Sequence, residues 1–295
     1  MAHRLSAALV TVFLLAGCAP APSPSGTPAT SQPTGTAAPS ASASASASAS
    51  ASATPTPTQT TPTTTGLVYY IVDTTRGFRL AREARSLAAG TPARAALEAM
   101  VAGPSDPDYT SPWPKATRIL GINHRDHLVT VELSDEARQA NVGASLEASM
   151  VQQLIWTVTE ALEPGASVLV TLEGEPASWG HLLWDKPLKR GEALDERLLV
   201  GIDSLAEGAT VTSPVRVSGE ANVYEATLPW KVLRMDGSTA ASGFTNTAEG
   251  QVFAPWELTL TLEPGTYVLE VFEDDPSGGL SQRPPDTDSR RFTVG

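Results

Sequence analysis

The sequence predicts two folded domains behind an unstructured leader. The first is an α+β domain over residues 67–200 with the element order ββαββαβ, and the second is an all-β sandwich over residues 201–295. The first domain mixes period-two alternation of apolar residues with two stretches of helical spacing, whereas the second shows alternation and turn residues alone. Residues 19–66 are too poor in apolar side chains to fold. The pattern changes near Asp203, which marks the predicted domain boundary.

Residues 1–17 have the pattern of an export signal. Arg4 precedes the apolar run Leu5–Ala16, which is shorter than the about 20 residues that a membrane-spanning helix needs. The run ends in Leu-Ala-Gly-Cys at positions 15–18, which resembles the signal of bacterial lipoproteins. The resemblance implies cleavage after Gly17, a diacylglyceryl group on the Cys18 thiol, and acyl chains such as palmitate that anchor the protein to the outer side of the cell membrane. The alternative is an ordinary secretory signal in which Cys18 is incidental.

Residues 18–66 form a predicted tether. After Cys18 they contain no charged residue, no aromatic residue and almost no aliphatic residue larger than alanine. Such a segment cannot bury enough apolar surface to offset the entropy lost on ordering, so we expect it to be disordered. Its Ser, Thr and Pro content also suits O-glycosylation.

The first domain is expected to pack two helices on a sheet. A helix is expected to begin at Thr91-Pro92 and to end at Gly103-Pro104, because proline suits the first helical position and glycine the end. A second helix carries an apolar stripe of Leu146, Met150, Val151, Leu154, Ile155 and Val158. The expected ranges are strands at 67–73 and 77–86, the first helix, a hairpin of 116–122 and 128–133 around residues 123–126, the second helix at 145–162 and a strand at 167–172.

Alternation of apolar and polar residues predicts the strands of the second domain. The alternating apolar residues include Val215 and Val217, the series Trp256, Leu258, Leu260 and Leu262, and the series Tyr267, Leu269 and Val271. Asp236-Gly237 and Pro264-Gly265 indicate turns between strands. Because Cys18 is the only cysteine of the chain, no disulfide can join the two sheets, and packing of Trp230 and Trp256 is expected in its place.

Both domains resemble known families. The first resembles the GerMN domain of sporulation and spore-germination proteins, through the segments at 97–104, 128–134, 153–160, 168–174 and 187–190. The second is similar to the immunoglobulin-like domain of bacterial spore germination, through the segments at 213–219, 222–226 and 267–273. These resemblances imply a GerMN fold followed by an immunoglobulin-like sandwich, and a role in assembling or maintaining structures of the cell envelope.

Sequence motifs for catalysis are weak, and we predict neither catalytic residues nor a cofactor. The chain has no G-x-S-x-G elbow and no phosphate-binding G-x-x-x-x-G-K-[ST] loop. His124 and His127, with Asp126, are the best metal candidates, but we expect a solvated turn there. Glu173 and Glu175 are the nearest pair for acid–base chemistry, and solubility of a strand edge explains them better.

Two features leave alternatives open. The acidic clusters at 273–275 and 286–288 are expected at one end of the sandwich, where they form either a calcium site or a flexible acidic loop. Trp156 lies roughly opposite the apolar stripe of its helix. It is either buried by a second segment or an exposed aromatic anchor that makes it a candidate partner-binding residue. The sequence does not choose between these.

Charge and composition limit the kinds of partner that the protein can bind. The net charge of −12 argues against binding to nucleic acid or to an anionic lipid surface. We therefore predict a non-catalytic binding or assembly module of the cell envelope, held outside the membrane by its lipid. Its expected partner is an unknown envelope protein. The alternative function is a surface protein that binds cell-wall glycan, for which a row of exposed Trp and Tyr residues on a sheet face is the expected sign.

Overall fold

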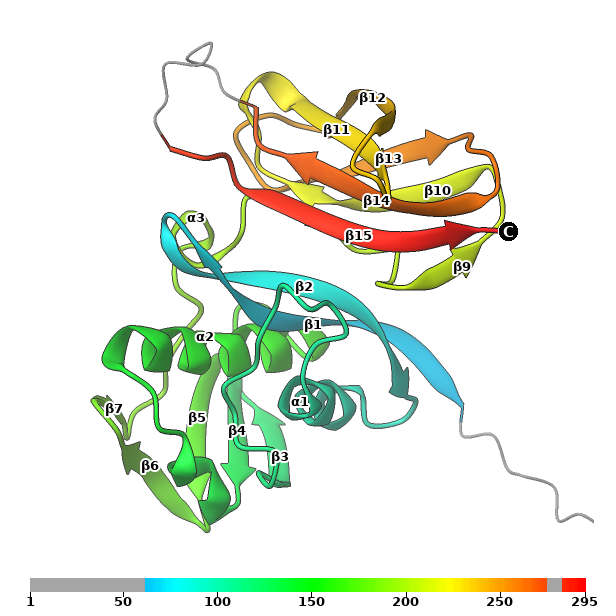
Figure 1. Ribbon diagram of the computed structural model, residues 1–295. Coiled ribbons are helices and arrows are strands. Elements are labelled where there is room, and N and C mark those ends of the chain that lie inside the picture. Colours follow the sequence, from blue (N-terminus) through cyan, green and yellow to red (C-terminus); the bar gives the residue numbers. More distant parts are fainter. Residues whose placement is uncertain (1–61, 275–282) are drawn as a thin grey trace, which may run out of the picture. The chain divides into compact units, whose positions relative to one another are not determined.

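The computed structural model describes residues 62–274 and 283–295 (Figure 1). These described residues belong to one compact unit. The predicted signal peptide, Cys18 and the tether up to residue 61 lie outside the described residues. In the part of the chain that the structure describes, no helix is both long and apolar enough to cross a membrane.

The first domain has three layers (Figure 1). The outer layer is an antiparallel hairpin of β1 (Thr63–Thr74) and β2 (Gly77–Ala88). The middle layer contains α1 (Pro92–Ala102) and α2 (Ala144–Ala161). The third layer is a five-stranded sheet in the order β3-β4-β5-β6-β7. Its strands are β3 (Ile119–Arg125), β4 (Leu128–Leu133), β5 (Ser167–Leu172), β6 (Glu175–Trp179) and β7 (Leu182–Trp184).

The predicted order ββαββαβ is confirmed, but the ends of several elements differ. β1 begins at Thr63, which lies inside the segment predicted to be tether. β3 begins at Ile119, not at 116, and continues to Arg125, because the hairpin turn consists of Asp126 and His127 alone, at φ 52° and 59°. These dihedrals are those of a tight two-residue turn that joins strands directly. The sequence analysis also missed β6, β7, the short helix α3 (Ala193–Glu196) and a 3-10 helix (Asp135–Gln139).

α2 is buried on two faces, which is why the domain needs a third layer. β4 and β5 are parallel, and α2 crosses between them, so its stripe of Met150, Leu154 and Val158 packs into the main core. On the other face, the Thr157 hydroxyl accepts a hydrogen bond from the Tyr69 amide at 3.2 Å, and the Gln153 amide group donates to the Tyr69 carbonyl at 3.0 Å. The expectation of helices packed on one sheet was therefore incomplete, since the β1–β2 hairpin covers the side of α2 that faces away from the sheet.

The second domain is a sandwich of two sheets, as predicted. One sheet has the strand order β13-β10-β8 and the other β12-β11-β14-β15-β9. The bounds are β8 (Val200–Ile202), β9 (Ala209–Val211), β10 (Val215–Ala221), β11 (Thr227–Arg234), β12 (Thr239–Asn246), β13 (Ala254–Leu260), β14 (Gly265–Phe272) and β15 (Thr287–Val294). Trp256 is buried in the core and Trp230 packs against it from a half-buried position, in agreement with the predicted replacement for a disulfide.

Candidate functional site

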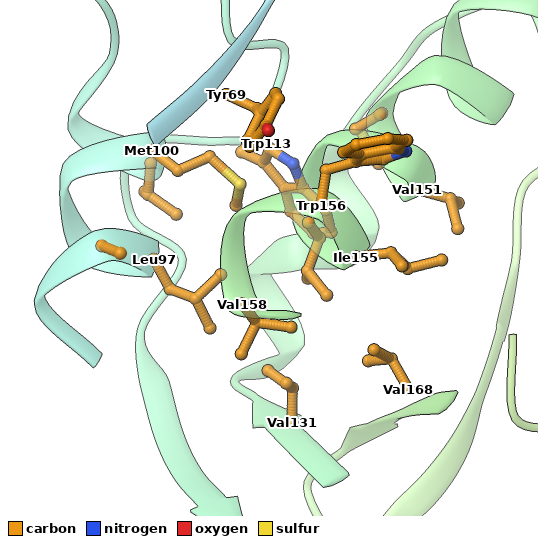
Figure 2. Close-up of a cluster of buried hydrophobic side chains, with 14 of the residues drawn as sticks. Tyr69, Leu97, Met100, Trp113, Val131, Val151, Ile155, Trp156, Val158 and Val168 are labelled. Atoms are coloured by element: carbon orange, nitrogen blue, oxygen red, sulfur yellow. The ribbon is translucent and has the colours of Figure 1, made fainter. Parts of the chain in front are cut away.

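Trp156 lies inside the first domain and is only 5% exposed. Its ring centroid is 5.4 Å from that of Tyr69 on β1, and Figure 2 shows the two side chains next to each other. The guanidinium of Arg190 lies over the indole at 4.3 Å from the ring centroid, and that of Arg197 at 5.6 Å. The interpretation of Trp156 as an exposed anchor for a partner is therefore wrong, because the β1–β2 hairpin and two arginines cover the side of α2 that faces away from the stripe.

The two histidines converge on a residue that sequence reasoning missed. His124 Nε2 lies 2.8 Å from Glu163 Oε2, and His127 Nδ1 contacts Glu163 Oε1. Glu163 reaches them because β4 and β5 are parallel and start at the same edge, so the loop before β5 runs beside the β3–β4 turn. Hydrogen bonds to His127 and His124 hold the pKa of the Glu163 carboxyl below its usual value. The described residues contain no group of three or more side chains arranged to hold a metal ion.

Glu173 and Glu175 are not brought together with another acid. Both are exposed: Glu173 lies on the turn between β5 and β6, where Glu173 and Gly174 have positive φ values of 48° and 91°, and Glu175 is the first residue of β6. Glu173 accepts a 3.3 Å hydrogen bond from the amide of Asp135. Both side chains are solvated, which is compatible with the solubility of a strand edge that the sequence analysis preferred for this pair.

A buried carboxylate that the sequence analysis missed is Glu147 on α2. It accepts hydrogen bonds from the amides of His181 (2.8 Å) and Leu182 (3.0 Å) and from the Trp184 indole (3.3 Å). Desolvation raises the pKa of this carboxyl, but hydrogen bonds from His181, Leu182 and Trp184 outweigh it and leave the pKa below its usual value. Glu147 therefore acts as an anchor for the β6–β7 hairpin, with its oxygens occupied by donors.

The acidic residues 286 and 288, offered above as calcium ligands, instead bind arginines and backbone amides. Asp286 contacts Arg76 of the β1–β2 turn and accepts a 3.1 Å hydrogen bond from the Leu199 amide. Asp288 accepts a 2.7 Å bond from the amide of Ile202. Both aspartates are 3% exposed. The calcium interpretation therefore lacks its set of free oxygens among the described residues, and residue 275 of the other cluster lies outside them.

Arg290 is the centre of this polar cluster and is 2% exposed. Its Nη1 lies 2.6 Å from Asp106 Oδ2 and 2.7 Å from Asp288 Oδ1, and its Nη2 donates to the Ile202 carbonyl at 3.0 Å and to the Tyr109 hydroxyl at 3.1 Å. The Tyr109 hydroxyl in turn donates to Asp288 at 2.5 Å. We call these residues, Asp106, Tyr109, Asp288 and Arg290, the Arg290 cluster. It joins the loop after α1 in the first domain to β15 in the second.

The pKa values in the Arg290 cluster follow from burial and charge. Desolvation raises the pKa of Asp106 to about 6, against the opposing effects of the Asp108 amide and Arg290. Burial raises the pKa of Tyr109 well above its usual value, and the neighbouring Asp288 raises it further. Burial opposes the charge of Arg290, but Asp288, Tyr109 and Asp106 raise its pKa, so the guanidinium stays charged. The cluster is a fixed cation enclosed by acceptors, which suits positioning more than proton transfer.

Further ion pairs extend this contact between the domains. Arg82 of β2 makes two hydrogen bonds to the Asp203 carboxylate, at 2.8 and 2.7 Å, and Arg197 pairs with Glu220 at 2.6 Å. A cleft of about 210 Å³ lies beside them, lined by charged residues that include Glu83, Asp203 and Arg290. Glu83 accepts hydrogen bonds from the backbone after α1, so these three charges already have partners.

One signal in the sequence points to the Arg290 cluster. Phe292 and Val294 are buried in the sandwich core, and period-two alternation along β15 places positions 290 and 288 on the same face. Charged residues at strand positions that alternate in step with buried apolar residues face the core, where a charge needs a partner, so they indicate a buried ion pair. Asp106 and Tyr109 could not be found in this way, because they lie in a loop without periodicity.

Residues 57–178 match the family model Germane, described as sporulation and spore germination, and residues 199–280 match Gmad2, the immunoglobulin-like domain of bacterial spore germination. No curated protein sequence matches the chain.

Three solved structures have similar parts. The first contains the tandem GerMN domains of the sporulation protein GerM from Bacillus subtilis, with 16% identity, a TM-score of 0.37 and coverage of 44% of this chain and 45% of that one. A putative lipoprotein from Clostridium perfringens has 19% identity and a TM-score of 0.31 over 43% of this chain and 87% of its own. The first GerMN domain of GerM alone has 19% identity and a TM-score of 0.31 over 42% of this chain and 97% of its own. The present chain therefore spans less than half of the tandem-domain protein.

The two resemblances noted in the sequence are confirmed by the family models. One match covers most of the first domain and the other most of the second. The chain thus consists of an α+β segment that matches a sporulation and spore-germination family, followed by a β-sandwich segment that matches the immunoglobulin-like domain of bacterial spore germination.

Proposed function

We propose that this protein is a lipid-anchored extracytoplasmic lipoprotein that acts as a non-catalytic binding or assembly module of the cell envelope, in a process related to sporulation or germination. The pairing of the two matched segments in one chain supports the process, since both descriptions refer to spore germination. The Leu-Ala-Gly-Cys pattern at 15–18 supports the anchor. The two domains would then be presented from the membrane as one unit.

The observation that supports a non-catalytic role is the Arg290 cluster. Burial of a charged arginine between two aspartates is costly, and it is tolerated where every donor and acceptor is satisfied. Here a buried group of charged side chains joins two domains, and the donors and acceptors of Arg290 and its partners are occupied by one another and by the Ile202 carbonyl. A joint of this kind would hold the two domains in one arrangement, which supports a role in binding or assembly.

The glycan-binding alternative receives less support. Five tryptophans have side chains that the structure describes: Trp113, Trp156, Trp184, Trp230 and Trp256. None of these is exposed, and the exposed large aromatic side chains among the described residues are Tyr224 and Phe244. The row of Trp and Tyr on a sheet face, which glycan binding predicts, is therefore missing from the described part of the chain.

The proposed anchor is tested by Cys18→Ala in the native host. We expect the wild type to incorporate an alkyne analogue of palmitate and to fractionate with the membrane, and the variant to lose the label and appear in the medium or as unprocessed precursor. Gly17→Ala is the matched control, because it keeps a small residue before the cysteine and should keep the label. A cleaved Cys18→Ala protein that remains in the membrane fraction would place the anchor elsewhere.

A further inference from the structure

The edge of β1 that faces away from β2 is covered by the chain itself in the middle of the strand. The Tyr69 amide donates to the Thr157 hydroxyl at 3.2 Å, and the Tyr69 carbonyl accepts a hydrogen bond from the Gln153 side chain at 3.0 Å. Ile71 exchanges two backbone hydrogen bonds with Thr110, at 2.8 and 2.7 Å. The amides and carbonyls of Tyr69 and Ile71 therefore point away from β2 and have partners elsewhere in the chain.

The beginning of the same edge has no such partner. β1 and β2 pair without a register shift along their whole length, and in a regular antiparallel ladder alternate residues direct their amide and carbonyl to opposite sides of the strand. Thr63, Thr65 and Leu67 are in phase with Tyr69, so their three amides and three carbonyls also point away from β2. No other described residue makes a hydrogen bond to these six groups. We call residues 63–67 the free edge of β1.

The free edge is accessible to another chain. The first three residues of β1 are exposed, and full burial of the strand begins only at Val68. A groove of about 380 Å³ lies beside the free edge, and Leu67, Pro92 and Ala161 are among the residues that line it. This groove leaves room for a second backbone next to Leu67.

The free edge also lacks the features that normally prevent strands from pairing between molecules. Unpaired edges are usually protected by charged side chains, proline, a bulge or a covering element. Residues 62–72 carry no charged side chain, and neither do residues 86–89, which include the residues paired with the start of β1. Two copies of a chain with a net charge of −12 repel each other, but a neutral edge allows them to meet without opposing like charges.

A second copy of the free edge is complementary to the first by symmetry. In an antiparallel pair centred on Thr65, Thr63 of one copy lies opposite Leu67 of the other, and the two Thr65 residues face each other. Each of these facing pairs can exchange two hydrogen bonds, so the pairing uses all six free groups of each copy. Opposed threonines are also a favourable cross-strand pair. Because burial begins at Val68, the folded bodies of the two copies lie beyond opposite ends of the shared ladder.

We infer that the free edge of β1 pairs with the free edge of a second copy of this chain, which gives a two-fold symmetric dimer. A ladder of three facing pairs is short, so the dimer is weak in free solution. This inference goes beyond the proposed function and does not require the lipid anchor. Anchoring of both copies in one membrane would raise their effective concentration and favour the same pairing.

The first test is crosslinking of single-cysteine variants. The full chain carrying Cys18→Ala contains no cysteine, so one thiol can be placed at will. Thr65→Cys brings two thiols together in the dimer, because facing residues of a hydrogen-bonded pair have Cα atoms about 5.5 Å apart. Ser242→Cys is the matched control, since Ser242 is exposed on β12, another uncharged strand at the edge of a sheet. We expect a short bismaleimide to crosslink Thr65→Cys at least tenfold faster than Ser242→Cys.

The second test weakens the pairing without touching the fold. Thr65→Pro removes one free amide and keeps the ladder to β2, because that amide points away from β2. Thr65→Lys places like charges opposite each other across the two-fold axis. In sedimentation velocity, both variants of the Cys18→Ala chain should dimerise only at concentrations at least tenfold higher, with an unchanged urea midpoint. If Thr65→Pro lowers that midpoint, Thr65→Lys decides. Ser242→Lys should dimerise as the Cys18→Ala chain does.

The inference is overturned if the two cysteine variants crosslink at equal rates, or if Thr65→Lys dimerises as readily as the Cys18→Ala chain. It is also overturned if the chain stays monomeric while a peptide that alternates threonine with valine binds at Thr65, because the free edge would then take a foreign strand. All measurements are made in solution without lipid. Failure of the dimer and failure of the proposed anchor can therefore be told apart.

Discussion

Replacing Trp156 by alanine should destabilise the protein strongly, because the indole fills space that no other side chain reaches. The ring lies 5.4 Å from Tyr69 and is covered by Arg190, whose guanidinium is also bonded to the Trp156 carbonyl and to Glu160. Alanine would leave a cavity between α2 and β1 that this hydrogen-bonded surround cannot collapse to fill.

The expected cost follows from the contacts. A buried tryptophan replaced by alanine costs about 3–5 kcal/mol. Loss of the interaction with Arg190, at 4.3 Å from the ring, adds up to about 2 kcal/mol where the pair is desolvated. One term opposes this: the Trp156 Nε1 hydrogen has no acceptor, and its removal relieves an unsatisfied donor. We therefore expect about 3–5 kcal/mol for Trp156→Ala and less than about 2 kcal/mol for Trp156→Phe, which keeps a ring and removes the donor.

The assay is urea unfolding of the full chain, monitored by circular dichroism. The dependence of the unfolding free energy on urea concentration is compared between variants, so that a change in midpoint can be read as a change in stability. Met235→Ala is the control, because that side chain is 61% exposed and should change the unfolding free energy by less than about 0.5 kcal/mol. A midpoint for Trp156→Ala equal to that of the wild type would refute the reasoning, since it would mean that the β1–β2 hairpin does not cover the indole in solution.

Three further predictions concern charge and metal. Arg290→Met should cost about 3–5 kcal/mol in urea unfolding, because it leaves Asp106 and Asp288 buried without their cation; a cost below about 1 kcal/mol would contradict a buried joint. The pKa of Asp106 is raised to about 6 in the folded protein, so protonation of this group favours the folded state, and its contribution to stability should grow as the pH falls from 7 towards 4. Asp106→Asn should remove that part of the pH dependence. If the unfolding free energies of the variant and the wild type change in parallel with pH, Asp106 does not have the raised pKa. EDTA should leave the melting temperature unchanged, and a melting temperature lowered by EDTA, together with stoichiometric zinc or calcium in mass spectrometry, would show a metal that the described residues do not account for.

The local sequence accounts for most of the secondary structure. Pro92 and Gly103 place the ends of α1 because their backbone preferences act at those positions whatever the rest of the fold does. The alternation of Trp256, Leu258 and Leu260 likewise predicts β13, since a strand with one buried face requires period two. β6 and β7 were missed because they are only five and three residues long, and their hairpin depends on the buried Glu147, which is remote in sequence.

The sequence by itself predicted the α+β domain and the sandwich, because each depends on periodicity within a segment. The export signal with Cys18 and the charge-free tether stay predictions from the sequence, which rest on composition. Only the tertiary structure decided which single side chains are buried and which partners they bind. Trp156 is buried because a hairpin from residues 63–88 covers α2, and Glu163 meets two histidines because parallel strands begin at one edge. Asp288 became a partner of Arg290 and Tyr109 instead of a candidate calcium ligand. Burial and ion pairing depend on which distant segments meet, and no periodicity within one segment carries that information.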